Sequence, residues 1–401
     1  MKAEVVNAWR SPVVVIAAGV CAALHVGKLP PAISALQQSL GVSLVQAGFL
    51  LSLVQFAGMT AGIAFGAWAD SMGLKRSITV GLSILALASA AGGLVQTSAW
   101  LLVLRAVEGF GLLLVVLPAP ALLRRLVPAA HVNQLLGVWG AYMPFGAALA
   151  LLAGPAWIDA LGWRSWWWGI GAASALMAIA VARAVPALHD SAGSKGAPYS
   201  WPARLRTTLS RTGPWLVALT FAVYSGQWLA VIGFLPTIYR QDGMSAGSIG
   251  VLTALAAAAN VIGNIAAGRL LQGGAKPAVL MSIGFATMAV GSAAVFAGSE
   301  GAGLPTALRY LAVLGFSALG GLIPGALFAT AVRVAPDERT ISTTVGWMQQ
   351  WSSFGQFAGP PLVAWVATRA GGWQWTWIAT GLMCLAGLVL AKKVGQVGNE
   401  R

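Results

Sequence analysis

The sequence is short of charge, of cysteine and of histidine. Only 8% of its 401 residues are charged and 58% are hydrophobic, whereas a soluble domain has about a quarter of its residues charged. Two cysteines and three histidines, scattered along the chain, predict neither a disulfide framework nor a metal site. The pair Gly27-Lys28 lacks the upstream glycine and the following hydroxyl residue of a phosphate-binding loop. These shortages argue against a soluble protein, a resident cofactor, direct use of ATP and an enzyme.

What the sequence has instead is long apolar runs. A membrane-spanning helix needs about 20 mostly apolar residues. Twelve such runs lie at 11–34, 44–69, 77–97, 99–122, 134–157, 165–186, 214–238, 246–271, 277–298, 304–331, 342–368 and 373–392. They are too long for barrel strands and do not alternate polar with apolar residues. The sequence therefore predicts an all-α membrane protein with twelve transmembrane helices.

The distribution of basic residues predicts how the chain is oriented across the membrane. Of the 24 Lys and Arg residues, 18 fall in the N-terminus, the even-numbered connections and the C-terminus, and three fall in the opposite loops. This asymmetry predicts that both termini are cytoplasmic and that the protein lies in the inner membrane. The first run is too long for the apolar core of a signal peptide, and we expect it to be the first span. The net charge of +14 therefore comes from basic residues in the short loops between membrane spans, so the expected partner is the lipid bilayer and not nucleic acid.

The two halves of the chain resemble each other. Gly27-Lys28-Leu29-Pro30 is echoed by Gly233-Phe234-Leu235-Pro236, and Pro118 returns as Pro324. The offset is 206 residues for both echoes, so the halves run in the same order and orientation. The polar stretch 187–213 separates them. We expect an N-terminal six-helix bundle at 1–186, a cytoplasmic linker at 187–213 and a C-terminal six-helix bundle at 214–401.

The connection after the second run carries a recognisable motif. Gly66-Ala-Trp-Ala-Asp70-Ser-Met-Gly73-Leu-Lys75-Arg76 resembles the loop signature of the major facilitator superfamily, whose two parallel six-helix repeats move substrates by alternating access. A short loop needs glycine for its turn, and the aspartate can cap or pair. The resemblance implies a cytoplasmic gate formed by Gly66, Asp70, Gly73, Lys75 and Arg76. Ser71 replaces the usual basic residue after the aspartate, which predicts a thinner charge network.

Two further patterns narrow the resemblance. Leu104-Arg105-Ala-Val-Glu108-Gly109-Phe-Gly111 resembles the superfamily's fourth-helix pattern. Gly137-Val-Trp139, followed by Gly146 and Gly154-Pro155, is similar to the cyanate permease and nitroimidazole transporter branch, although that branch's Arg-Pro pair in helix 1 is absent. The fifth-helix signature of drug antiporters is degenerate, since Ala150-Leu151 stand where Gly-Pro would.

Ionisable residues inside a span are costly unless they have a partner or face a cavity. His25 and Lys28 are three residues apart on the first helix, so they share a face. Pro30 and Pro31 follow and should bend or loosen the helix there. One hypothesis makes Lys28 the anchor for an anionic substrate and His25 its proton-linked neighbour. The alternatives are that Lys28 extends to the outer interface and that His25 only packs.

The fourth helix adds Arg105 and Glu108, also three residues apart. The pair either carries coupling protons, with Glu108 and His25 as carriers, or merely locks the helix to a neighbour. Arg309 occupies the repeat-equivalent position of Arg105. It is either a second anion clamp or an interfacial anchor.

Polar-tipped aromatic and amide side chains inside the spans are candidates to orient a small solute. We expect the wall of the substrate cavity to include Tyr142, Tyr224, Gln227, Trp228, Trp347, Gln350 and Trp351. Each could instead be a packing residue. Trp163 and Trp166 to Trp168 are predicted to lie in the interfacial aromatic belt.

Together these patterns predict a secondary transporter. Because Lys28 and Arg309 have no evident acidic partner in the sequence, the favoured hypothesis is monomeric, proton-coupled uptake of a small organic or inorganic anion. Proton-antiport export of a toxic or drug-like compound is the alternative. A membrane sensor on the same fold is a third hypothesis, and a membrane-embedded enzyme has the least support.

Overall fold

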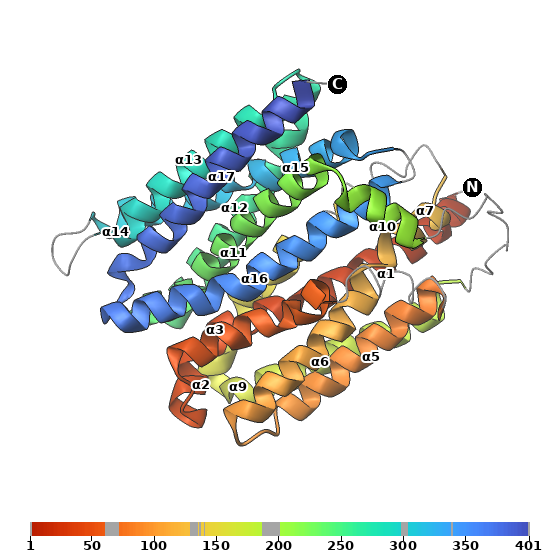
Figure 1. Ribbon diagram of the computed structural model, residues 1–401. Coiled ribbons are helices and arrows are strands. Elements are labelled where there is room, and N and C mark those ends of the chain that lie inside the picture. Colours follow the sequence, from red (N-terminus) through yellow and green to blue (C-terminus); the bar gives the residue numbers. More distant parts are fainter. Residues whose placement is uncertain are drawn as a thin grey trace. The chain divides into compact units, whose positions relative to one another are not determined.

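The computed structural model describes residues 2–60, 72–128, 135, 138–139, 141–186, 201–297, 304–337 and 340–399. All regular structure within these ranges is helical (Figure 1), which confirms the predicted all-α class. The chain divides into two compact units. Unit 1 comprises Met1–Ser43, Phe56–Ser194 and Gly233–Ala254, and unit 2 comprises Leu44–Gln55, Lys195–Ile232 and Leu255–Arg401. The predicted six-helix bundles and linker remain a prediction.

Many helices have the length and composition of membrane spans. In the described ranges, nine helices are long and apolar enough to cross a membrane. The chain is therefore a multi-pass membrane protein. The number of twelve spans and the cytoplasmic position of both termini stay predictions. Gly66, Asp70 and residues 187–200 of the predicted linker lie outside the described residues.

The helices of the first half follow the predicted runs closely. They are α1 (Lys2–Gly27), the 3-10 turn η1 (Pro30–Ala32), α2 (Ile33–Leu40), α3 (Leu44–Ser52), the 3-10 turn η2 (Leu53–Gln55), α5 (Leu74–Gly92), α6 (Ser98–Val116), α7 (Ala119–Leu126) and α9 (Tyr142–Ala184). α9 joins two predicted helices. Gly162 stands at its kink with φ +80° and ψ 160°, a conformation that glycine adopts without the steric cost of a Cβ.

The helices of the second half begin with α10 (Trp201–Leu209), which lies in the predicted linker. They continue with α11 (Thr212–Gln241), α12 (Ala246–Gln272), α13 (Pro277–Phe296), α14 (Thr306–Gly320), α15 (Leu322–Val334), α16 (Ile341–Ala370), the 3-10 turn η4 (Trp373–Trp375) and α17 (Thr376–Asn399). In unit 2, α13 packs along α14 and α17 (Figure 1).

Glycine sets how closely the helices approach. In unit 1, a Cβ added to Gly27 of α1 would lie 2.8 Å from the Cα of Ala147 in α9. In unit 2, a Cβ added to Gly226 of α11 would lie 2.6 Å from the carbonyl oxygen of Gly355 in α16. Between helices in lipid, small residues permit the close van der Waals contact that drives association. Each unit thus contains close helix pairs that depend on glycine, of which these are two examples.

Candidate functional site

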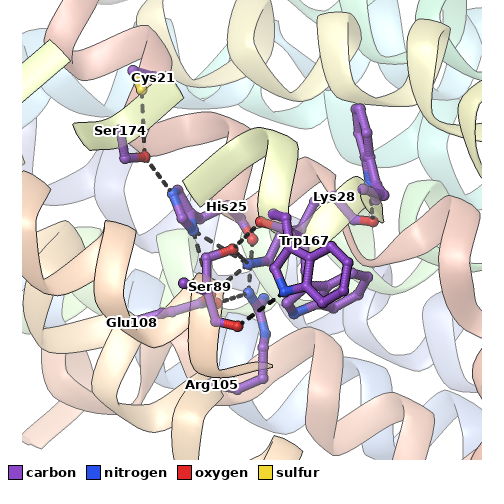
Figure 2. Close-up of polar contacts among 11 residues, drawn as sticks. Cys21, His25, Lys28, Ser89, Arg105, Glu108, Trp167 and Ser174 are labelled. Atoms are coloured by element: carbon purple, nitrogen blue, oxygen red, sulfur yellow. Dashed lines mark hydrogen bonds and ion pairs between the residues drawn. The ribbon is translucent and has the colours of Figure 1, made fainter. Parts of the chain in front are cut away.

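Unit 1 encloses a cluster of polar and charged side chains from four helices (Figure 2). Its members are Cys21 and His25 of α1, Lys28 directly after α1, Ser89 of α5, Arg105 and Glu108 of α6, and Trp167 and Ser174 of α9. Lys28 and Arg105 are 0% exposed, and Glu108 is 1% exposed. We name this set the buried charge cluster. Its charges lie inside helices of membrane-spanning length, so each needs a partner.

The ammonium group of Lys28 has a protein acceptor for each of its N–H groups. Its Nζ forms an ion pair with Glu108 Oε1, donates to Ser89 Oγ at 2.8 Å and lies 3.3 Å from His25 Nδ1. The ammonium also lies 4.9 Å from the centroid of the Trp167 ring, a cation–π distance. Because an ammonium has three N–H donors, these three acceptors use all of them.

Glu108 lies between two cations. Its second carboxylate oxygen, Oε2, accepts from Arg105 NH1 at 2.5 Å. The same NH1 donates to the carbonyl oxygen of His25 at 2.7 Å. Arg105 therefore joins α6 to the backbone of α1, while Glu108 joins it to the Lys28 side chain. The predicted pairing of Arg105 with Glu108 is confirmed, and it is part of a larger network.

His25 extends the cluster toward α9. Its Nδ1 faces Lys28 and lies 3.4 Å from Glu108 Oε1, while its Nε2 lies 2.8 Å from Ser174 Oγ. Ser174 Oγ in turn lies 3.5 Å from the sulfur of Cys21. An imidazole bonded at both nitrogens can take a proton at one and release it at the other. The arrangement can therefore pass a proton between Lys28 and Ser174.

The break after α1 supplies backbone partners for the cluster. Pro30 and Pro31 have no N–H, and α1 ends before them at Gly27, so the helix predicted over 11–34 is interrupted and not only bent or loosened. This end leaves carbonyl groups without helical partners. Arg105 satisfies the carbonyl of His25. Trp166 Nε1 donates to the carbonyl of Lys28 at 3.0 Å.

Two expectations need correction. The sequence shows no acidic partner near Lys28 and therefore suggested a free positive charge, but Glu108 supplies a partner from α6, 80 residues away in the chain. The tryptophans of the expected interfacial belt are also mostly buried, with Trp163 4%, Trp166 5% and Trp167 1% exposed. Only Trp168, 45% exposed, keeps the accessibility expected of a belt residue. The kink at Gly162 starts a new helix whose tryptophans pack inward, toward α1 and α5.

A second polar group lies in unit 2 and includes three predicted cavity residues. Tyr224 of α11 accepts from Asn260 Nδ2 at 2.8 Å, and Trp228 Nε1 donates to Ser317 Oγ at 3.1 Å. Asn260 also donates to the carbonyl of Ser317 at 3.0 Å, which joins the two pairs. Gln227 accepts from the thiol of Cys384 at 3.1 Å. This second polar group thus spans α11, α12, α14 and α17.

The other predicted cavity aromatics lie in two places. Trp347 and Trp351 of α16 meet Trp215 of α11 edge to face, with ring centroids 4.9 Å and 5.7 Å from Trp215. Gln350 lies half-buried on the same helix. Tyr142 belongs to unit 1, where its ring stacks on Trp139 at 4.4 Å.

The remaining predicted residues lie near helix ends. Arg309 is half-buried in the first turn of α14, and its Nε has no hydrogen-bond partner among the described residues. Gly73 precedes α5 with φ +91°, a positive value that glycine adopts without steric cost; the motif predicted a glycine turn in this loop. Lys75 and Arg76 follow in the first turn of α5.

Sequence reasoning missed several members of both groups: Ser89, Ser174, Asn260 and Ser317 were not singled out. Asn260 had a detectable signal, because an asparagine inside an apolar run needs a partner. Serines inside helices give no such signal, since a serine can bond to its own helix. Among the described residues, no three His, Cys, Asp or Glu side chains gather to hold a metal ion.

The fold defines a class of protein. The structure aligns with a bacterial homologue of the human lysosomal transporter Spinster in an inward-facing, unoccupied conformation, over 98% of both chains, with a TM-score of 0.77 and 15% identity. It aligns with a D-xylose–proton symporter over 96% of this chain and 97% of that one, with a TM-score of 0.73 and 16% identity. At these identities the likeness establishes the fold alone, and that fold is the fold of multi-pass membrane transporters.

The sequence gives the family. The profile described as Major Facilitator Superfamily matches residues 15–349 and 217–396. The chain therefore belongs to the Major Facilitator Superfamily, a family of membrane transporters.

Two curated relatives share part of the sequence. The methyl viologen resistance protein SmvA of Salmonella typhimurium (strain 14028s / SGSC 2262) is 28% identical over 160 residues, 39% of this chain and 32% of that protein. The puromycin resistance protein pur8 of Streptomyces alboniger is 30% identical over 179 residues, 44% of this chain and 35% of that protein. The matched segments thus span about a third of the relatives' own length.

Proposed function

We propose that this transporter exports an aromatic, drug-like compound in exchange for protons, by alternating access in the inner membrane. In this proposal the chain works as a monomer with twelve spans and cytoplasmic termini. The buried charge cluster couples transport to protons, and the second polar group contributes to substrate binding. The narrower likeness to the cyanate permease and nitroimidazole transporter branch remains a prediction.

One observation carries the choice of export over anion uptake. Anion uptake was favoured because Lys28 was expected to offer an unpaired positive charge to the substrate. All three N–H donors of Lys28 instead have acceptors in the protein, and the side chain is 0% exposed. In this arrangement a substrate anion could bind Lys28 only by displacing Glu108, Ser89 or His25. The main support for an anion site is therefore lost.

The second polar group supports an aromatic substrate. Trp228 and Tyr224 combine a flat ring with a hydrogen-bonding tip, and such side chains both stack on and orient a ring compound. Asn260 and Ser317 hold these tips in place. The hydrogen bonds that hold this group together, in the part of the chain that the structure describes, join uncharged side chains, and such a site suits a cationic compound better than an anion.

The names of the relatives point the same way. Both are resistance proteins, one against methyl viologen and one against puromycin. Methyl viologen is an aromatic dication and puromycin carries an aromatic ring, so both suit aromatic side chains through stacking and cation–π contacts.

Anion uptake is the second candidate, and Arg309 favours it. The side chain is half-buried and its Nε has no hydrogen-bond partner among the described residues. A guanidinium with donors to spare can hold a carboxylate or another planar anion. If the protein imports anions, Arg309 is the residue that binds them.

Two measurements test this proposal: the drug resistance of cells that express the protein, and transport into membrane vesicles. Cells that lack their own exporters would express the full chain and be exposed to methyl viologen, puromycin and ethidium, a fluorescent aromatic cation. We expect resistance to at least one compound, and movement of that compound in energised everted vesicles that stops when a protonophore collapses the gradient. Trp228→Ala should weaken transport, whereas the exposed-ring control Trp375→Ala, 48% exposed in the wild type, should not. Gradient-driven uptake of labelled small carboxylates, without resistance to any of the three compounds, would replace export by anion uptake.

A further inference from the structure

The buried charge cluster holds more positive than negative charge. Lys28 and Arg105 share one carboxylate, that of Glu108. With Lys28 as an ammonium and His25 neutral, the described side chains of the cluster together carry one positive charge in excess, at 0–1% exposure. Excess charge enclosed by helices of membrane-spanning length is energetically costly. The cluster becomes electrically balanced if Lys28 gives up one proton.

The other members cannot balance the cluster in this way. A guanidinium stays protonated in proteins, so Arg105 keeps its charge. Protonating Glu108 would leave two cations facing each other with no anion between them. Protonating His25 would add a second uncompensated charge. Lys28 is the one member whose proton loss removes the excess.

We propose that Lys28 is the residue that releases and takes up the coupling proton, and that Glu108 remains its fixed counter-ion. The proposal rests on the proton-coupled function above and assigns its proton site. It differs from the sequence-based hypothesis, in which Glu108 and His25 carried the proton and Lys28 bound the substrate.

The contacts of Lys28 are satisfied in both protonation states. As an ammonium it donates to Glu108, Ser89 and His25 Nδ1. As a neutral amine it has two N–H donors and one lone pair, so it can still donate to Glu108 and Ser89 while accepting from an Nδ1–H of His25. The change needs only the other tautomer of His25 and no movement of a heavy atom.

His25 and Ser174 provide the exit for the proton. The Nζ–H bond of Lys28 breaks as an Nδ1–H bond forms on His25. The Nε2–H bond of His25 breaks as Ser174 Oγ, 2.8 Å away, takes that proton. Ser174 is 0% exposed here, so its earlier hydroxyl proton passes to water when alternating access opens the cluster. One proton leaves the cluster, and His25 ends neutral with its tautomer reversed.

No other charge faces Lys28 from the described helices packed on α1. α1 itself contributes His25, and α6 contributes Arg105 and Glu108. From α5 and α9 the neighbours are uncharged, namely Ser89, Trp167 and Ser174. The acid of α9, Asp159, pairs with Arg240 instead, and the basic residues of α7, Arg124 and Arg125, lie exposed in its last turn.

The first test compares two variants of Lys28 in proteoliposomes, with ethidium as the probe. Lys28→Met cannot carry a proton, and Lys28→Arg keeps its charge permanently. Both should lose pH-gradient-driven ethidium accumulation by about 100-fold or more, with a much smaller loss of ethidium counterflow at equal pH. The matched control Lys276→Arg, in a loop before α13, should keep both. Gradient-driven accumulation that persists in either Lys28 variant would overturn the proposal.

The second test does not depend on transport, so it separates failure of this inference from failure of the export proposal. Infrared difference spectra of wild-type protein and Glu108→Gln, between about pH 5 and about pH 9, report whether Glu108 becomes a carboxylic acid. We expect no carboxylic acid band that depends on Glu108. We also expect Lys28→Met to unfold at the wild-type temperature or above, because it removes the excess charge. A Glu108 acid band that grows on acidification, or marked destabilisation of Lys28→Met, would overturn the assignment even if wild-type protein moves no ethidium.

Discussion

The ammonium of Lys28 lies 2.8 Å from the hydroxyl oxygen of Ser89, and this hydroxyl donates onward to the carbonyl of Trp167 at 2.8 Å. One serine thus joins α1, α5 and α9 inside unit 1. The contact also completes the hydrogen bonding of a buried lysine. A lysine whose three N–H groups are all hydrogen-bonded to the protein is not available to bind a substrate anion. Its charge instead contributes to the charge balance of the buried charge cluster.

Glu108→Gln should destabilise the protein strongly. Removing the carboxylate leaves Lys28 and Arg105 buried without a counter-ion, and breaking a buried ion pair from one side costs about 3–5 kcal/mol. Thermal unfolding in detergent would measure the loss. The control is Asp159→Asn, because Asp159 and Arg240 are 44% and 33% exposed and such a pair contributes about 0–1 kcal/mol. Equal shifts for both variants would show that the cluster contributes no more than a surface ion pair.

Gly27→Ala should also destabilise the protein, by about 1–3 kcal/mol. The new Cβ would lie 2.8 Å from the Cα of Ala147 and 2.8 Å from the Cβ of Ala150, both in α9. The two helices would therefore have to separate. Gly381→Ala in α17 is the control, because a Cβ there meets nothing within 4 Å. That control should be neutral or slightly stabilising, since alanine has the higher helix propensity. A neutral Gly27→Ala would mean that α1 and α9 do not need this close approach.

Tyr224→Phe should change the apparent affinity for the substrate more than the stability. The variant removes one hydrogen bond, that from Asn260, and a typical bond of this kind contributes about 0.5–1.5 kcal/mol. Transport assays with puromycin or ethidium would show a raised KM with a maximal rate close to that of the wild type. Tyr310→Phe, in the first two turns of α14, is the matched control. An unchanged KM for every transported compound would remove Tyr224 from the binding site.

Arg309→Gln separates the two candidate functions. If the protein exports aromatic compounds, the variant should keep their transport within about twofold of the wild type. If it imports anions, the same variant should abolish uptake of labelled carboxylate. Arg369→Gln serves as control, because Arg369 is held over the ring of Trp365 at 5.8 Å in the last turn of α16. Loss of ethidium transport in Arg309→Gln but not in Arg369→Gln would contradict the export proposal.

The sequence by itself determined the class of this protein. Its apolar runs and low charge require helices in lipid, because in a bilayer the backbone groups of each segment must bond within the segment. The same local rules predicted that the first helix bends or loosens at Pro30 and Pro31, that the loop turns at its glycines, and that Arg105 and Glu108 can pair. These features depend on residues a few positions apart, and spacing along the chain is enough to predict them.

The partners of the charged residues follow from helix packing and could not be read from spacing along the chain. Glu108 reaches Lys28 from 80 residues away, and Ser89, Ser174 and Trp167 reach the same point from two other helices. Their meeting depends on how α1, α5, α6 and α9 pack, which is set by close contacts such as that of Gly27 with Ala147. A one-dimensional pattern reports that a lysine lies in a span. It cannot report that three acceptors from three helices surround its ammonium, because that depends on the rotation and depth of each helix in the bundle.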